Sequence, residues 1–66
     1  MYTDKRGNIL YEGKVVVNEH GNFYKVDGFD TSREYFVKLS NGCVHSYAKP
    51  ESLLCINSVS DFYENW

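Results

Sequence analysis

The chain has 66 residues, 17% of them aromatic, and a formal net charge of −2. A chain this short buries only about 60% of its unfolded surface, so we expect one small domain without room for a deep catalytic pocket. Seven Lys and Arg residues balance seven acidic residues within positions 1–56, and the acidic excess follows them. This neutrality argues against non-specific nucleic-acid binding, which depends on phosphate neutralisation, and against mimicry of DNA.

The cysteine content and the hydropathy of the chain bear on its compartment. Cys43 and Cys55 are the two cysteines, fewer than a small secreted domain usually carries. The N-terminus is polar and lacks the apolar segment of a signal peptide, and no stretch is long and apolar enough to span a membrane. We therefore expect a cytoplasmic protein with reduced thiols and no membrane partner.

The first half of the chain predicts one hairpin preceded by a short strand. The segments that are rich in β-branched or aromatic residues and bounded by turn formers are 9–11, 14–18 and 22–27. His20-Gly21 predicts a two-residue turn between the last two, which would pair Val17 with Tyr24. A loop is expected over 28–33, where turn formers are frequent.

The strongest local signal is Asn41-Gly42, between two runs that alternate apolar and polar residues. Asn-Gly is typical of a type I′ turn, because both central residues of that turn need a positive φ. The flanking strands are expected at 34–40 and 43–47, with Leu39 opposite Val44. A turn misassigned by one residue would move every side chain of its hairpin to the other face.

The C-terminal part predicts a turn, a short strand and a tail. Pro50 lacks a backbone donor and cannot continue a strand, so residues 48–52 predict a single 3₁₀ turn. A last strand is expected at 53–57. The chain thus divides into a domain at residues 1–57 and an aromatic and acidic tail at 58–66. The tail would pack on its own domain or dock to another chain.

The expected elements make an all-β domain, and side-chain alternation selects its core. The residues expected to be buried are Val15, Val17, Tyr24, Val26, Tyr35, Val37, Leu39, Val44, Leu54 and Ile56.

The order of strand, hairpin, loop, hairpin, one-turn helix and strand matches a five-stranded SH3-like barrel. The spacings that carry the likeness are Gly13-x-Val15-x-Val17, Gly21-x-x-Tyr24-x-Val26, Val37-x-Leu39-x-Asn41-Gly42 and Pro50-Glu51-x-Leu53. They resemble small SH3-like barrels of the KOW and Tudor kind and cover residues 13–57. The chain is also similar to small accessory proteins of phages and mobile elements that use this barrel. The resemblance implies a fold; barrels of this kind bind proteins, RNA or modified peptides, or act as inhibitors.

One face of the two hairpins, together with the adjacent loop, is the candidate binding site. Aromatic residues there alternate with basic ones, and an exposed patch of this kind often marks an interaction site. The residues expected to contact a partner are Phe23, Lys25, Phe29, Arg33, Phe36, Lys38, His45 and Tyr47. The alternative is that a second core layer or the tail covers these rings.

No motif indicates catalysis or a bound metal. Cys43 and His45 are two residues apart on one strand, but structural zinc sites usually use closely spaced ligand pairs. No third residue to orient a Cys–His pair can be named, and the glycines are isolated turn residues rather than a phosphate loop. We therefore expect a non-enzymatic protein without a metal or cofactor.

The sequence favours a protein-binding module that modulates or inhibits another protein, with a host factor as one such partner. The alternative is a single-stranded nucleic-acid-binding barrel, in which the same rings stack on bases and lysines follow the phosphates. A third expectation is a homodimer formed through an exposed edge strand.

Overall fold

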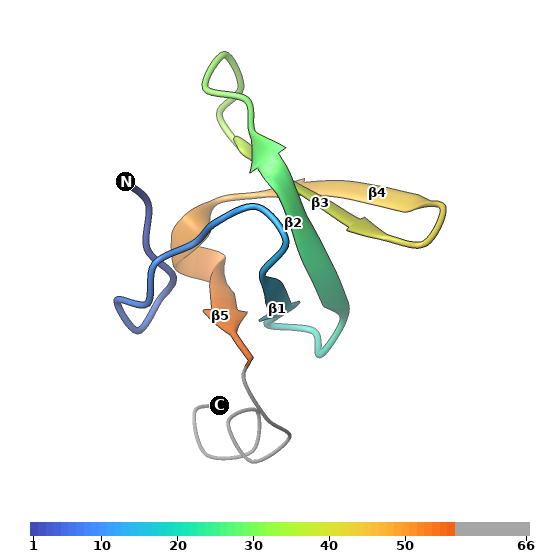
Figure 1. Ribbon diagram of the computed structural model, residues 1–66, viewed down its shortest axis with the longest axis horizontal. Helices are drawn as coiled ribbons and strands as arrows, with labels where there is room; N and C mark the ends of the chain where they lie inside the picture. Colours follow the sequence, from blue (N-terminus) through green and yellow to red (C-terminus); the bar gives the residue numbers. More distant parts are fainter. Residues whose placement is uncertain (57–66) are drawn as a thin grey trace.

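The computed structural model describes residues 1–56, so the predictions for the tail at 58–66 lie outside the described residues. Within that part of the chain, five antiparallel strands form one sheet in the order β4-β3-β2-β1-β5 (Figure 1). The elements are β1 at Val15–Asn18, β2 at Phe23–Phe29, β3 at Val37–Asn41, β4 at Val44–Ala48, the 3₁₀ turn η1 at Pro50–Ser52, and β5 at Leu53–Cys55. The all-β class, the five strands and the turn before the last strand are confirmed.

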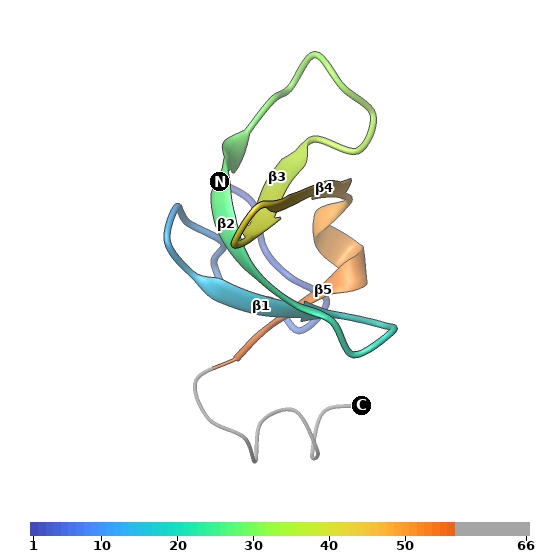
Figure 2. The ribbon, with the colours of Figure 1, turned by 90° about the vertical axis from the view of Figure 1, so that its right-hand side faces the viewer.

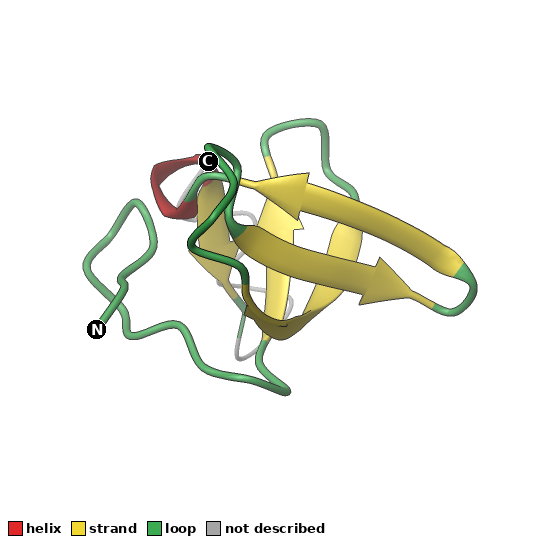
Figure 3. Cartoon of the chain, turned by 90° about the horizontal axis from the view of Figure 1, so that it is seen from above, coloured by secondary structure: helices red, strands yellow, loops and turns green. Residues whose placement is uncertain are grey.

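The sheet is strongly curled but open. The long strand β2 runs from the β1–β5 side to the β3–β4 side, and the two pairs cross at a steep angle (Figures 1 and 2). The β3–β4 hairpin extends well beyond the remaining strands when the molecule is seen from above (Figure 3). β4 and β5 are the two ends of the strand order and do not pair with each other.

The main core cluster lies on the concave side of the curl. Its buried members are Leu10, Val16, Val26, Val37, Leu39, Leu53 and Cys55, with Tyr2, Tyr24, Phe29, Phe36 and Ala48 packed against them. Val26, Val37 and Leu39 were expected in the core and are confirmed there. Each comes from a segment in which apolar and polar residues alternate, which is the pattern of a half-buried strand.

The first hairpin differs from its predicted register by one residue. Val16, rather than Val17, lies opposite Tyr24. The loop has three residues rather than two: Asn18 and Asn22 close it, and Gly21 takes the left-handed conformation at φ 82°. The Asn18 side chain explains this choice, because its Oδ1 accepts the N–H of both His20 (3.0 Å) and Asn22 (2.9 Å).

The second hairpin is displaced by one residue at its turn. The loop residues are Gly42 and Cys43, so Val44 lies opposite Asn41 and Ser46 lies opposite Leu39. Gly42 has φ 63°, and within residues 1–56 only glycines have a positive φ, so the φ values of Gly42 and Cys43 have the signs of a type II′ turn rather than type I′. Contrary to the expectation that a turn displaced by one residue exchanges the two faces, sliding the whole turn by one position shifts the pairing by two residues along β4, so each side chain stays on its expected face.

These registers correct several expected core positions. Val15 is 44% exposed because the one-residue shift turns it away from the core, while Val44 is 58% exposed because it moves to the hairpin tip. Tyr35 precedes β3 and is 54% exposed. Tyr24 and Ile56 are half-buried. Val17 and Leu54 are buried as expected, but they lie opposite each other on the side away from Val16.

A β-bulge extends β2 into the segment expected to be a loop. The pairing of β2 with β3 shifts between Val26 and Gly28, which inserts one extra residue into β2. The extra residue reverses which side chains of β2 face the core beyond this point. Phe29 therefore lies opposite the buried Val37 and faces the core. The sequence gives only the isolated Gly28 as a hint of this feature.

Residues 1–10 fold back onto the sheet instead of forming the expected strand at 9–11. An isolated bridge joins Thr3 and Ile9. The buried carboxylate of Asp4 accepts hydrogen bonds from the N–H groups of Arg6 (2.9 Å) and Asn8 (2.8 Å), which closes the intervening turn. Asp4 also accepts the N–H of Cys55 at 2.7 Å, so this turn is attached to β5.

Candidate functional site

The outer face of the sheet is the convex side, opposite the core cluster. On this face Lys25 of β2, Ser40 of β3 and His45 of β4 lie side by side across the strands. In the next row on the same face, Lys38 of β3 lies opposite Tyr47 of β4. Lys25, Lys38 and His45 are exposed, and Tyr47 is 39% exposed. The sequence assigned these four residues to one face, and the register of the sheet places them there.

Arg33 joins this face from the loop between β2 and β3. Its guanidinium carbon lies 3.8 Å from the centroid of the Tyr47 ring, which is a cation–π contact. Asp30 organises this loop through hydrogen bonds. Its carboxylate accepts hydrogen bonds from the hydroxyl (2.6 Å) and the N–H (3.2 Å) of Ser32, and its backbone oxygen accepts one from the N–H of Arg33. The Ser32 hydrogen bonds, with the charges of Arg33 and Lys38, lower the pKa of Asp30.

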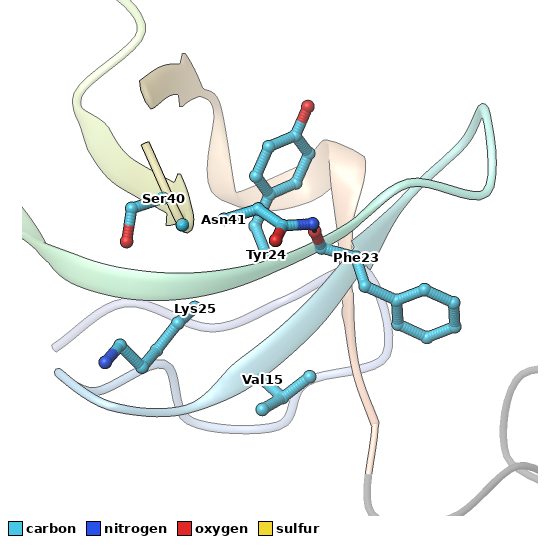
Figure 4. Close-up of a pocket in the computed structure, with 7 residues that line it drawn as sticks. Val15, Phe23, Tyr24, Lys25, Ser40 and Asn41 are labelled. Atoms are coloured by element: carbon cyan, nitrogen blue, oxygen red, sulfur yellow. Dashed lines mark hydrogen bonds between the residues drawn. The ribbon is translucent and has the colours of Figure 1, made fainter. Parts of the chain in front are cut away.

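Phe23 and Lys25 line a hollow of about 360 Å³ beside this face (Figure 4). Its other lining residues are Val15, Tyr24, Ser40, Asn41 and Gly42. Phe23 is 45% exposed at one end, and its backbone oxygen accepts a hydrogen bond from Asn41 Nδ2 at 3.0 Å. That bond joins the start of β2 to the end of β3, so two hairpins form the walls of the hollow.

A second hollow adjoins the first around the same Phe23 and Asn41. It has a volume of about 410 Å³, and Val44 lies at its β4 side. Val15 and Val44 are exposed apolar residues that the sequence pattern had placed in the core. The Asn18 side chain was the available signal for Val15, since an Asn before a turn favours a loop closed by its own oxygen.

Phe29 and Phe36 do not belong to the exposed face, and this corrects the expected contact set. Tyr2 packs against both rings, with centroid distances of 4.9 Å to Phe29 and 4.7 Å to Phe36. Both are half-buried against the core. The bulge turns Phe29 inward, and Phe36 lies before β3 begins, so strand alternation does not assign its face.

The two cysteines occupy different environments. Cys55 is buried, and desolvation together with the charge of Asp4 raises the pKa of its thiol to about 11. Cys43 is exposed in the β3–β4 turn. Among residues 1–56 no group of three or more His, Cys, Asp and Glu side chains is arranged to hold a metal ion.

The described part of the chain contains no helix with the length and apolar character needed to cross a membrane. Comparison with protein-family models, with curated proteins and with solved structures finds no match to this chain.

Proposed function

We propose that this chain is a non-enzymatic, cytoplasmic protein-binding module built as a small SH3-like barrel. The order of five strands with a 3₁₀ turn before the last supports the barrel assignment, as does the long, bulged β2 shared by both halves of the curled sheet. A partner protein, such as a host factor that the module modulates or inhibits, would bind the outer face of β2 to β4.

The observation that carries the proposal is the combination of apolar and basic side chains beside an open hollow. Phe23 offers an exposed ring for apolar anchoring, and Arg33 holds the Tyr47 ring in a cation–π contact. Lys25 and Lys38 are exposed next to them. Aromatic residues and Arg are enriched in interface cores, while surrounding charges set orientation and association rate. The described geometry therefore suits a partner surface with an apolar anchor and acidic groups.

The test is affinity capture from lysate with the tagged chain, with and without nuclease, followed by identification of bound protein and nucleic acid. We expect one protein at near-stoichiometric yield under both conditions. The double variant Phe23→Ser/Lys38→Glu should lose the partner while circular dichroism stays unchanged, because it removes an exposed ring at one end of the outer face and reverses the charge opposite Tyr47 without changing a core residue.

The matched control is Ile9→Ser/Arg6→Glu, which changes an exposed apolar and an exposed basic residue in the N-terminal segment beside β5. This variant should retain the partner. Equal loss in both variants, or retention in both with folded protein, would show that the outer face is not the binding surface.

The second candidate function is binding of single-stranded nucleic acid, which the alternation of Lys25 and Lys38 with aromatic rings on one face favours. The neutral balance of residues 1–56 argues for the protein partner instead. Salt separates the two: nucleic-acid affinity should fall steeply between 50 and 200 mM salt, on the order of tenfold or more for each two or three phosphates contacted. Binding through apolar anchors should change much less.

A further inference from the structure

The two ends of the sheet differ in how their backbone groups are satisfied. At the β5 end, the oxygen of Leu53 accepts the N–H of Lys5 at 3.0 Å, and the N–H of Cys55 donates to Asp4 at 2.7 Å. The N-terminal segment thus covers that end. β4 forms the opposite end, and no strand of residues 1–56 pairs with its outer side. An uncovered edge strand is a template for pairing with another chain.

The register identifies which backbone groups face outward from β4. A two-residue turn makes Asn41 and Val44 a hydrogen-bonded pair, and such pairs alternate along an antiparallel ladder. His45 and Tyr47 are therefore in the non-hydrogen-bonded positions, and their N–H and C=O groups point away from β3. None of the turn and loop hydrogen bonds within residues 1–56 reaches these groups.

The edge lacks the features that usually prevent strand addition. Within Val44–Ala48 there is no proline, no lysine and no acidic residue. The β3–β4 ladder has five consecutive pairs without a bulge. Natural edge strands are commonly protected by charges, proline or bulges. The two flanking residues that would oppose pairing, Lys49 and Pro50, follow the strand rather than interrupt it.

We propose that two copies of this chain associate through antiparallel pairing of β4 with β4, about a two-fold axis at Ser46. In this register His45 of one copy lies opposite Tyr47 of the other. Because both residues present outward N–H and C=O groups, the two His45–Tyr47 pairs form four backbone hydrogen bonds. The interface is isologous, as a closed two-fold dimer requires.

The charge distribution is compatible with this partner. Residues 1–56 carry equal numbers of acidic and of Lys and Arg residues, so two copies of this part meet without net repulsion. The outer-face row of Lys25, Ser40 and His45 would continue across the axis into Tyr47 of the second copy. The paired sheets would thereby join two outer faces into one surface, whatever that surface binds.

Sedimentation velocity of the full-length chain over a hundredfold concentration range tests the dimer. We expect a concentration-dependent shift from monomer to dimer. His45→Pro should weaken association about tenfold or more, because it removes an outward N–H from each copy without breaking a bond to β3. His45→Ala, which keeps that N–H, should associate like the wild-type chain. A wild-type monomer at every concentration, or equal association of both variants, would overturn the proposal.

Cysteine cross-linking tests the register. Ser46 residues at the axis form a non-hydrogen-bonded pair with Cα atoms about 4.5 Å apart, within the range that a disulfide spans. On a Cys43→Ser background, Ser46→Cys should give a disulfide dimer under mild oxidation, and His45→Cys should give much less. Equal cross-linking of the two cysteine variants, or no cross-linking of either while a dimer is seen by sedimentation, would contradict the axis at Ser46.

A dimer that appears only after removal of residues 57–66 would instead identify the tail as the occupant of the edge and overturn the proposal for the full chain. Because these experiments use pure protein, their failure would leave the proposed partner binding untouched.

Discussion

Asp4 shows how one buried side chain joins distant parts of this small domain. Its carboxylate accepts hydrogen bonds from Arg6, Asn8 and, across the fold, Cys55. Desolvation raises the pKa of Asp4, but the hydrogen bonds together outweigh it and hold the pKa below 3.8. Hydrogen bonds to an ionised carboxylate stabilise more than neutral ones do, so this residue fastens the N-terminal segment to β5.

Asp4→Asn should lower the free energy of unfolding at pH 7 by about 2 kcal/mol, because the amide nitrogen cannot accept the hydrogen bonds made to Oδ2. Since the folded-state pKa is below the unfolded value, the wild-type stabilisation is complete well above pH 3.8 and is lost as the pH falls through the folded-state pKa. Urea unfolding of both proteins at pH 7 and in strong acid measures the difference. Equal stability at pH 7 would show that Asp4 is not a fastening residue.

The cysteines should differ in reactivity, because the thiolate is the reactive form. With the pKa of Cys55 near 11 and its side chain buried, we expect no modification at pH 8, while the exposed Cys43 reacts. Mass spectrometry after brief treatment with iodoacetamide should find one adduct on the folded chain, at Cys43, and two after denaturation. An adduct at Cys55 in the folded protein would contradict the packing of β5 against the N-terminal segment.

Among the secondary-structure elements, the residues of each turn determine the hairpin register where the strand pattern alone allows more than one. The alternation in β3 was sufficient to predict that Val37 and Leu39 are buried. The run Val15 to Val17 has no alternation of apolar and polar residues, so only the turn determines which of these valines face the core. The side-chain oxygen of Asn18 favours a three-residue loop there. In the second hairpin, Asn-Gly indicated a hairpin correctly but not which two residues form its turn.

Gly42→Ala tests the observed turn. A residue with a side chain at φ 63° in this turn is strained, and an added Cβ would meet nothing within 4 Å, so the cost is confined to the backbone. We expect a loss of about 1–3 kcal/mol in thermal or urea unfolding. Cys43→Ala, at the second turn position with a negative φ, should change stability by no more than about 0.5 kcal/mol. A neutral Gly42→Ala, or an equal loss in both, would contradict the type II′ assignment.

Long-range packing explains the residues that sequence patterns could not assign. Tyr2, near the N-terminus, packs against Phe29 and Phe36, so these two rings do not belong to the expected binding face. The contact between Asp4 and Cys55 spans 51 positions in the sequence. Local periodicity contains no information on such contacts, whereas the grouping of Lys25, Lys38, His45 and Tyr47 on one side follows from strand parity alone.

The sheet as a whole separates two surfaces that differ in the burial of their side chains. The concave side holds the core, and the N-terminal segment covers the β5 end. The convex side of β2 to β4 presents exposed basic and aromatic side chains, and no strand of residues 1–56 pairs with the outer side of β4 beside them. We infer that a partner binds the convex side of β2 to β4, because the β5 end of the sheet is already covered by the N-terminal segment.

The proposed binding face can be tested directly by mapping backbone amide shifts by NMR while the partner captured from lysate is titrated into the labelled chain. We expect the perturbed amides to cluster at Phe23–Lys25, Lys38–Ser40 and His45–Tyr47, with Arg33 beside them. Amides at residues 3–9 and in β5 should stay unchanged. Perturbations concentrated in the N-terminal segment and β5, with no shifts on the outer face of β2 to β4, would show that the partner does not bind this face.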